Sequence, residues 1–344
     1  MCTISVKNLT IKKGDEQIKK MEKVDTLSLQ YYFMNDRNKE KIANNIKSRL
    51  HYNYNEDKQL VYYTGKCKLY GFYYNTRTYC LTITLQHKQI KDKTYLQIQE
   101  EAEKFIRNYF NINTNLEGLN RIDYKNDILI NEETELNIIK NIFEKATDSI
   151  LKNYNKEINE SEGFYKVRYR SKGSSSAEIV FYDKGKEMLK LLKENRVQED
   201  EANRYKHLFR TEVRIKNKRL NYEKRSYGQD KVLLNYYNEE QARNFYNYYI
   251  KKILGTERFY RIDIAKKIIN ESKKLKNKMK EKLTELLLNV NKKGYTEAME
   301  NYNKGTFRTY KKKIEALGIN ILTFNEKVNG NETVEYIENF GLMK

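Results

Sequence analysis

The chain has 344 residues and a formal net charge of +20, because 67 Lys and Arg residues outnumber 47 Asp and Glu residues. This length is enough for two domains of ordinary size or one large domain with a sizeable core. A positive surplus of this size attracts polyanions through phosphate contacts and counterion release. Nucleic acid is therefore the leading expected partner, and an anionic membrane surface is the second.

Several protein classes are disfavoured by the sequence. No apolar run approaches the roughly 18 residues that a membrane-spanning helix needs, and residues 1–25 lack the apolar core of a secretory signal. We therefore expect a soluble, cytoplasmic protein that is not inserted in a membrane. Cys2, Cys67 and Cys80 show no C-x-x-C spacing, so neither a disulfide framework nor a zinc ribbon is predicted. A Gly-x-x-x-x-Gly-Lys-Ser/Thr loop is missing, which argues against an ATP-driven motor.

Strand and helix patterns alternate over the first two thirds of the chain. Period-two apolar patterns and strand-forming residues predict strands at residues 23–33, 60–64, 66–74, 79–87, 116–125, 165–170, 177–182 and 207–216. Helical spacing of apolar residues predicts helices at 38–50, 94–110, 132–153 and 184–194. Residues 171–174 form the expected hairpin turn. This order predicts an α+β fold with two similar halves of antiparallel sheet and helices packed on one face.

The last third of the chain is helical and basic. Helices are predicted at residues 239–254, 260–289, 294–303 and 306–317, and residues 266–282 are rich in lysine. We expect a boundary within residues 222–238, which divides the chain into domains of residues 1–230 and 231–344. In the final helix, Gly305 and Thr306 are predicted to cap the start, and Gly318 suits the left-handed residue after the end.

Two predicted strands place a carboxylate among basic residues. Arg121 and Asp123 share one strand face, and Arg210, Glu212 and Arg214 share another. If the strands converge, the carboxylates could hold Mg²⁺ or Mn²⁺, since hard cations prefer oxygen ligands, and the arginines could bind phosphates. The alternative is that these charges form Arg–Asp and Arg–Glu pairs across an antiparallel sheet.

Tyr182 ends a predicted strand and is followed by Lys184 and Lys186. A phenol with an ordinary pKa of about 10 is a poor nucleophile at neutral pH, so it needs nearby cations or a polarised phosphate. The lysines and a metal could supply both. The alternative is that Tyr182, one of 30 tyrosines, only completes its strand.

The order of these motifs resembles that of rolling-circle replication initiators. The similarity is greatest to the filamentous-phage gene-two replication protein family and its plasmid relatives. It is carried by Arg-Ile-Asp at 121–123, the segment from Ser-Ser-Ser at 174–176 through Phe-Tyr-Asp-Lys at 181–184 to Glu187, and Arg-Thr-Glu-Val-Arg at 210–214. Residues 305–321 resemble the family's C-terminal motif, and residues 24–27 resemble its first strand.

The resemblance implies a duplicated replication-initiator nuclease-like fold that nicks and rejoins DNA at an origin. Tyr182 would attack the scissile phosphate and leave a 5′-phosphotyrosine link and a free 3′-hydroxyl. The nearby Tyr165 and Tyr169 stay open as alternative nucleophiles. Asp123 and Glu212 would hold the metal ion, and Lys184 would steady the phosphate or the departing oxygen. The broader class uses two histidines on one strand, and this chain has no His-x-His pair.

The helices near residues 297–303 and 306–317 could form a helix-turn-helix whose basic face, with Arg308, Lys311 and Lys312, binds origin DNA. The alternative is a solvated basic face over a small helical core. Expected partners are the origin, supercoiled or single-stranded at the nick, a host helicase and a second copy of the chain. Two other functions stay open, a DNA-binding regulator without catalysis and a nickase like a conjugative relaxase.

Overall fold

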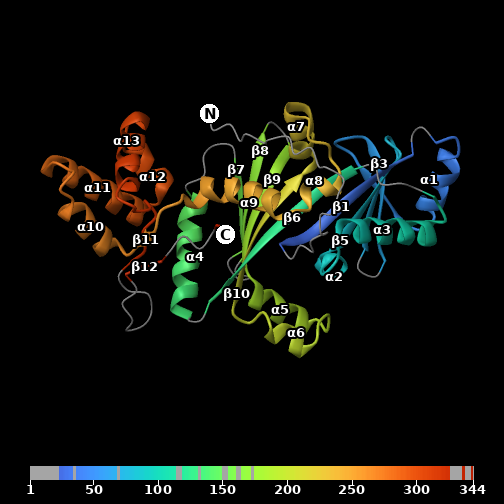
Figure 1. Ribbon diagram of the computed structural model, residues 1–344, viewed down its shortest axis with the longest axis horizontal. Helices are drawn as coiled ribbons and strands as arrows, with labels where there is room; N and C mark the ends of the chain where they lie inside the picture. Colours follow the sequence, from blue (N-terminus) through green and yellow to red (C-terminus); the bar gives the residue numbers. More distant parts are fainter. Residues whose placement is uncertain are drawn as a thin grey trace, which may run out of the picture. The chain divides into compact units, whose positions relative to one another are not determined.

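The computed structural model describes residues 23–33, 36–67, 70–113, 118–130, 133–148, 154–159, 164–171, 174–325, 335–337 and 342–343 (Figure 1). The chain forms two compact units, and each contains two separate segments. Unit 1 comprises residues 1–125 and 214–244, and unit 2 comprises residues 126–213 and 245–344. Both units combine antiparallel strands with helices, which confirms the predicted α+β class.

The strands of unit 1 are hydrogen-bonded in the order β2-β3-β4-β5-β1-β6. Every neighbouring pair in this series is antiparallel. Strand β6 belongs to unit 1 only as far as Lys125. The bounds are β1 Val24–Tyr32, β2 His51–Asn55, β3 Leu60–Cys67, β4 Tyr70–Asn75, β5 Cys80–Gln86 and β6 Gly118–Leu129.

Helix α3 (Tyr95–Phe110) covers one face of the unit 1 sheet. The rings of Phe105 and Tyr109 lie 5.9 Å and 5.7 Å from the ring of Phe72 on β4. The helix begins in a capping box, in which Thr94 accepts from the backbone of Gln97. The other helices of unit 1 are α1 (Lys39–Lys47), α2 (His87–Ile90), α7 (Asn217–Tyr227) and α8 (Leu233–Tyr236).

In unit 2 the strand order is β10-β9-β8-β7, with β10 included as far as Val213. Helix α4 (Glu133–Asp148) packs on this sheet, because the ring of Phe143 lies 3.9 Å from Phe181 on β9 and 5.2 Å from Phe209 on β10. The bounds are β7 Tyr154–Asn159, β8 Phe164–Ser171, β9 Ser174–Asp183, β10 Leu208–Lys216, α5 Lys184–Lys193 and α6 Glu199–Asn203.

The C-terminal part of unit 2 is a helical group centred on α11 (Asn277–Lys293). Helices α10 (Ile262–Glu271), α12 (Tyr295–Glu300) and α13 (Lys304–Glu315) all contact α11. The core of the group includes the buried residues Leu283, Leu286, Leu287, Val290, Ala298, Phe307 and Ile314. Helix α9 (Glu239–Leu254) precedes the group, and β11 (Phe259–Tyr260) pairs with β12 (Tyr336–Ile337).

Most predicted elements are confirmed, and the differences have physical reasons. The strands β2 and β7 were not predicted, because each ends the strand order of its unit and carries the polar residues typical of an edge strand. The short or polar helices α2, α6, α7 and α8 were also missed. The predicted helix at 260–289 is instead two helices, α10 and α11, because α10 ends at Glu271 and α11 begins at Asn277.

The two units have similar element orders, but among the described residues four strands (β2 to β5) follow α1 in unit 1 and three (β7 to β9) follow α4 in unit 2, and the units also differ in connection. In unit 1, the last strand of the meander, β5, pairs with β1, which precedes the meander in the chain. In unit 2, the last strand, β9, neighbours β10, which follows it. Residues 172–173 of the predicted turn and 149–153 of the predicted helix lie outside the described residues. The predicted domains, residues 1–230 for nicking and 231–344 for DNA binding, were defined by function, so the division stays a prediction. The compact units are a different division of the chain, because each contains residues on both sides of position 230.

Candidate functional site

Tyr182 and Glu212 form a hydrogen-bonded pair within unit 2. Tyr182 lies near the end of β9, on the strand face opposite to that of the core residue Phe181. Glu212 lies on β10. The Tyr182 hydroxyl donates to Glu212 Oε1 at 2.6 Å. Only 7% of Tyr182 and 2% of Glu212 are exposed, so the hydrogen bond lies in a largely dry environment.

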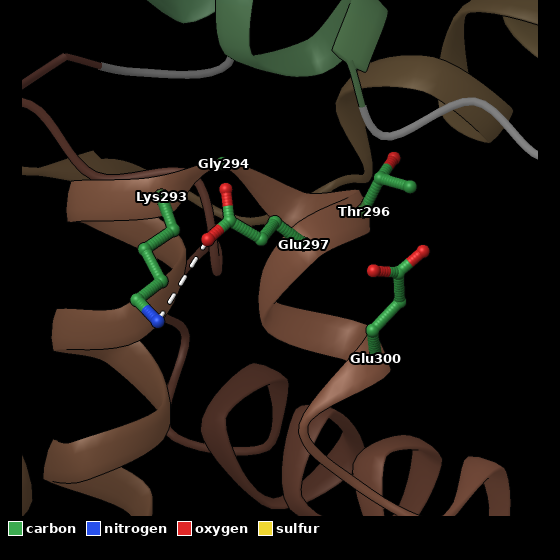
Figure 2. Close-up of a pocket in the computed structure, with 5 residues that line it drawn as sticks. All are labelled: Lys293, Gly294, Thr296, Glu297 and Glu300. Carbon is green, nitrogen blue, oxygen red and sulfur yellow. Dashed lines mark ion pairs between the residues drawn. The ribbon is translucent and has the colours of Figure 1, made fainter.

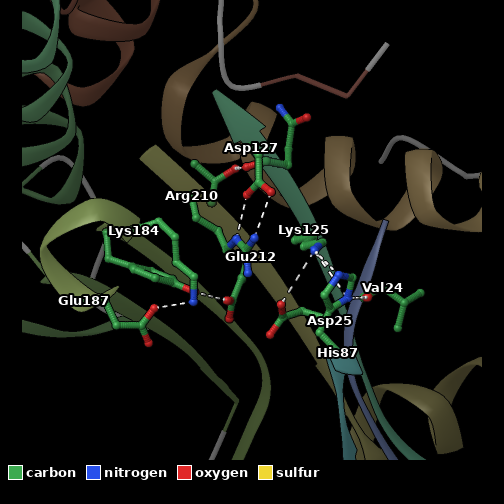
Figure 3. Close-up of polar contacts among 12 residues, drawn as sticks. Val24, Asp25, His87, Lys125, Asp127, Lys184, Glu187, Arg210 and Glu212 are labelled. Carbon is green, nitrogen blue, oxygen red and sulfur yellow. Dashed lines mark hydrogen bonds and ion pairs between the residues drawn. The ribbon is translucent and has the colours of Figure 1, made fainter. Parts of the chain in front are cut away.

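Lys184 provides a cation beside the ring of Tyr182. Figure 3 shows its ion pair with Glu187. The Lys184 Nζ atom lies 5.7 Å from the ring centroids of both Tyr182 and Tyr205. It also forms an ion pair of 2.5 Å with Glu187, one turn further along α5. The ammonium group is therefore held close to the tyrosine ring by contacts on its own helix.

The start of α5 fixes the position of Lys184. Asp183 caps the helix by accepting from the backbone N–H of Lys186 at 3.0 Å, and Lys140 of α4 lies 3.4 Å from the Asp183 carboxylate. A Cβ atom on Gly185 would lie 2.5 Å from the backbone oxygen of Lys206. Glycine thus allows the chain before β10 to approach the first turn of α5.

Asp123 has a different setting, in unit 1. The Arg121 guanidinium donates to both oxygens of this carboxylate, with Nε 2.7 Å from Oδ1, and Arg214 Nε lies 3.6 Å from Oδ2. Asp123 is 1% exposed. These contacts are those of the ion-pair alternative. The convergence of Asp123, in unit 1, with Glu212, in unit 2, stays a prediction.

Arg210 forms a bidentate ion pair with Asp127, a partner that was not predicted. Its Nε and Nη2 atoms donate to Asp127 Oδ1 and Oδ2 at 2.6 Å and 2.8 Å, and its side chain is 3% exposed. The predicted strand ended at Lys125, whereas β6 continues to Leu129, so Asp127 follows Asp123 on the same face. The alternation of charge at 123, 125 and 127 was the signal for this longer strand.

A second unpredicted cluster lies in unit 1, around Lys125 (Figure 3). The Lys125 ammonium lies 3.2 Å from His87 Nε2 and 4.0 Å from the Asp25 carboxylate. His87 Nδ1 lies 3.2 Å from the backbone oxygen of Val24. Lys125 is 7% exposed, so a lysine that the sequence suggested only as a strand end is a buried cation.

The predicted metal ligands do not form a complete site in the described residues. No group of three His, Cys, Asp or Glu side chains is placed there to hold an ion. Both oxygens of Asp123 already accept from Arg121, so a cation at this carboxylate would compete with a guanidinium group. Glu212 offers a carboxylate beside the candidate nucleophile. The Mg²⁺ or Mn²⁺ requirement therefore stays a prediction.

The predicted DNA-binding residues of α13 are divided by the structure. Arg308 and Lys312 are exposed. Lys311 instead forms an ion pair of 3.5 Å with Glu315, and its Nζ atom lies 5.4 Å from the ring centroid of Tyr295. The ion pair lies within α13, and the contact with Tyr295 connects α13 to α12.

Of the residues predicted from sequence, the structure brings together Tyr182, Lys184 and Glu212. It separately brings together Arg121, Asp123 and Arg214. No described helix is both long and apolar enough to cross a membrane. Comparison of the sequence with protein-family models and with curated proteins finds no match. The functional proposal therefore depends on the geometry of the site.

Proposed function

We propose that the chain is a DNA-nicking and strand-transferring enzyme that initiates rolling-circle replication through a 5′-phosphotyrosine intermediate. The observation that supports this proposal most directly is the hydrogen bond from Tyr182 to Glu212 at 2.6 Å. It joins residues from two separate motifs, and Lys184 supplies a cation beside the ring. A hydroxyl, a carboxylate that can accept its proton and an adjacent ammonium group suit nucleophilic attack on a phosphate.

The proposed reaction is a transesterification. As the Tyr182 oxygen bonds to the scissile phosphorus, its proton passes to Glu212, which already accepts the hydrogen bond. The bond from phosphorus to the 3′-oxygen breaks, and that oxygen leaves as a 3′-hydroxyl after taking a proton from water, while Glu212 returns its proton to the solvent. Lys184 stabilises the negative charge that develops on the phosphate and the departing oxygen. Rejoining is the reverse reaction, with a 3′-hydroxyl as the nucleophile.

A bound Mg²⁺ or Mn²⁺ would act as a Lewis acid toward the phosphate. In our proposal Glu212 and Asp123 remain the carboxylates for such an ion. The proposed substrate is origin DNA, supercoiled or single-stranded at the nick. The net charge of +20 supports a nucleic-acid partner.

The proposal is tested with supercoiled DNA of the genetic element that encodes the chain. The DNA is incubated with Mg²⁺ or Mn²⁺ and with the wild type, Tyr182→Phe or Tyr205→Phe. We expect a nicked product and a covalent protein–DNA adduct with the wild type and with Tyr205→Phe, and neither with Tyr182→Phe. Tyr205 is a matched control, because Lys184 lies equally far from both rings. Parallel reactions with a chelator test the metal requirement.

Two outcomes would contradict the proposal. An adduct that persists in Tyr182→Phe would assign the nucleophile to another tyrosine. DNA binding without a nick or an adduct from any of the proteins would favour the regulator without catalysis. A relaxase-like nickase shares the chemistry, and it would be recognised by cutting a transfer origin instead of a replication origin.

Glu212→Gln tests the proton acceptor. The amide keeps the size of the side chain but accepts a proton poorly, so we expect nicking to slow by roughly 10²- to 10⁴-fold while the fold is retained. Single-turnover nicking and circular dichroism measure the two effects. A folded variant that nicks at the wild-type rate would remove Glu212 from the chemistry, both as a base and as a metal ligand.

A further inference from the structure

Helices α12 and α13 are joined by the short connection that is typical of a helix-turn-helix. The three residues Asn301, Tyr302 and Asn303 join them, and both helices pack on α11. The ring of Phe307 on α13 lies 5.0 Å from Tyr295 on α12 and 6.2 Å from Tyr302 in the turn. A turn of three or four residues between two packed helices is typical of this motif. The aromatic contacts hold α13 in one position on the group.

The exposed face of α13 is basic. Lys304, Arg308 and Lys312 are spaced four residues apart, so they follow one another along a single face of the helix, and all three are exposed. Within the described residues, none of them has an ion-pair partner. The small residues Gly305 and Thr309 are also exposed beside them. This face thus presents three cations with little side-chain bulk between them.

The acidic residues of α12 gather at a different place. Glu297 and Glu300 line a pocket with Lys293, Gly294 and Thr296, and Lys293 lies 3.7 Å from Glu297 (Figure 2). Helix α12 also contacts α4. None of the three cations of the α13 face lines this pocket. In the part of the chain that the structure describes, neither glutamate forms an ion pair with a cation of the α13 face; Glu297 pairs with Lys293 instead.

We propose that α13 is a recognition helix that enters the major groove of duplex DNA. Its 12 residues span about 18 Å, and a helix with side chains is about as wide as the major groove. Arg308, at the centre of the face, contacts a base edge together with Thr309, and Lys304 and Lys312 contact phosphates. This inference deepens the proposed function, since it names the surface that holds the origin as a duplex while Tyr182 acts on one strand.

The test measures duplex binding in a Tyr182→Phe background, so that nicking plays no part. The affinity for a mixed-sequence duplex of 40 base pairs is measured against salt concentration for the Lys304→Gln/Arg308→Gln/Lys312→Gln variant. We expect at least a tenfold loss of affinity and a salt slope lower by about 2 in magnitude, since Lys304 and Lys312 each lose a phosphate contact that contributes roughly 0.9 to the slope. Circular dichroism confirms that the variant is folded.

A matched control removes the same charges elsewhere. The Lys91→Gln/Lys104→Gln/Arg107→Gln variant also loses two exposed lysines and one exposed arginine, all in unit 1. Equal loss of affinity in both triple variants would overturn the inference. Selection from a randomised duplex library provides a second readout, in which Arg308→Gln should lose preference at one base pair. A preference that is unchanged, or absent from the parent protein, would exclude base reading by Arg308.

If duplex binding depends on the basic face of α13 but the wild-type protein does not nick the DNA, the recognition helix is supported and the proposed nicking function fails. If the wild type nicks normally and the α13 variant binds as well as its parent, the nicking function is supported and the recognition helix fails. The two proposals are thus tested separately.

Discussion

Gly185 shows how one residue positions the candidate site. It lies in the first turn of α5, and a Cβ atom there would be 2.5 Å from Lys206 O and 3.1 Å from Tyr205 O. Because both neighbours are backbone atoms, they cannot rotate away. We expect Gly185→Ala to lower the free energy of unfolding by about 1 to 3 kcal/mol, as overpacked sites do. Urea unfolding measures this change. Gly71→Ala is the control, because its Cβ would meet only Thr84 at 3.7 Å; equal losses would refute the packing explanation.

At this scale, sequence periodicity predicted which face each side chain occupies but not which partner it meets. The alternation in β10 put Arg210, Glu212 and Arg214 on one face. Their partners depend on the register between strands, and no local signal in the chain encodes that register. In the structure Arg210 forms an ion pair with Asp127, and Arg214 forms one with Asp123. The sequence therefore identified Glu212, between two arginines, as a candidate site residue, but it could not predict the residues that Glu212 and the arginines contact.

Two asparagines at helix starts allow a prediction at the scale of elements. Asn303 caps α13 by accepting from the backbone N–H of Gly305 at 2.8 Å, whereas Asn38 at the start of α1 makes no such side-chain bond. We expect Asn303→Ala to cost about 1 kcal/mol of stability, and Asn38→Ala to cost less. Thermal unfolding of both variants measures the difference. The reverse order would show that the cap does not stabilise α13.

The predicted cap of α13 was placed too late in the chain, because Asn303 is the N-cap and accepts from the backbone N–H of Gly305, which lies with Thr306 in the first turn of the helix. Gly318 has a φ angle of +75°, as its predicted left-handed role requires. Helices with strong apolar stripes, such as α3 and α9, were predictable. Helix α7 was not, because only Leu220 supplies an apolar residue that is fully buried there. Helices of this kind are determined by their contacts with the rest of the fold and not by their own apolar pattern.

For the whole molecule, the net charge of +20 predicts how DNA binding responds to salt. If six or more phosphates are neutralised, affinity should fall by roughly 10³-fold or more between 50 and 200 mM salt. Fluorescence anisotropy with a labelled duplex measures this dependence. A nearly salt-independent affinity would mean that phosphate contacts do not dominate.

The order of helices and strands was enough to predict the fold class, but it did not predict the order of strands within the sheet of each unit. The last strand of each series has a different kind of neighbour: β5 lies beside β1, which precedes it in the chain, and β9 lies beside β10, which follows it.

The division of the chain into alternating segments has a consequence for synthesis on the ribosome. The chain alternates between the units, so that unit 1 needs residues 214–244 and unit 2 needs residues 245–344. The first unit therefore cannot complete its contacts until residue 244 has left the exit tunnel, although its first segment ends at residue 125. Residues 126–213 of the second unit are made before the second segment of the first unit, so the sheet of the first unit stays incomplete during that period, when exposed apolar surface and unpaired strand edges favour aggregation.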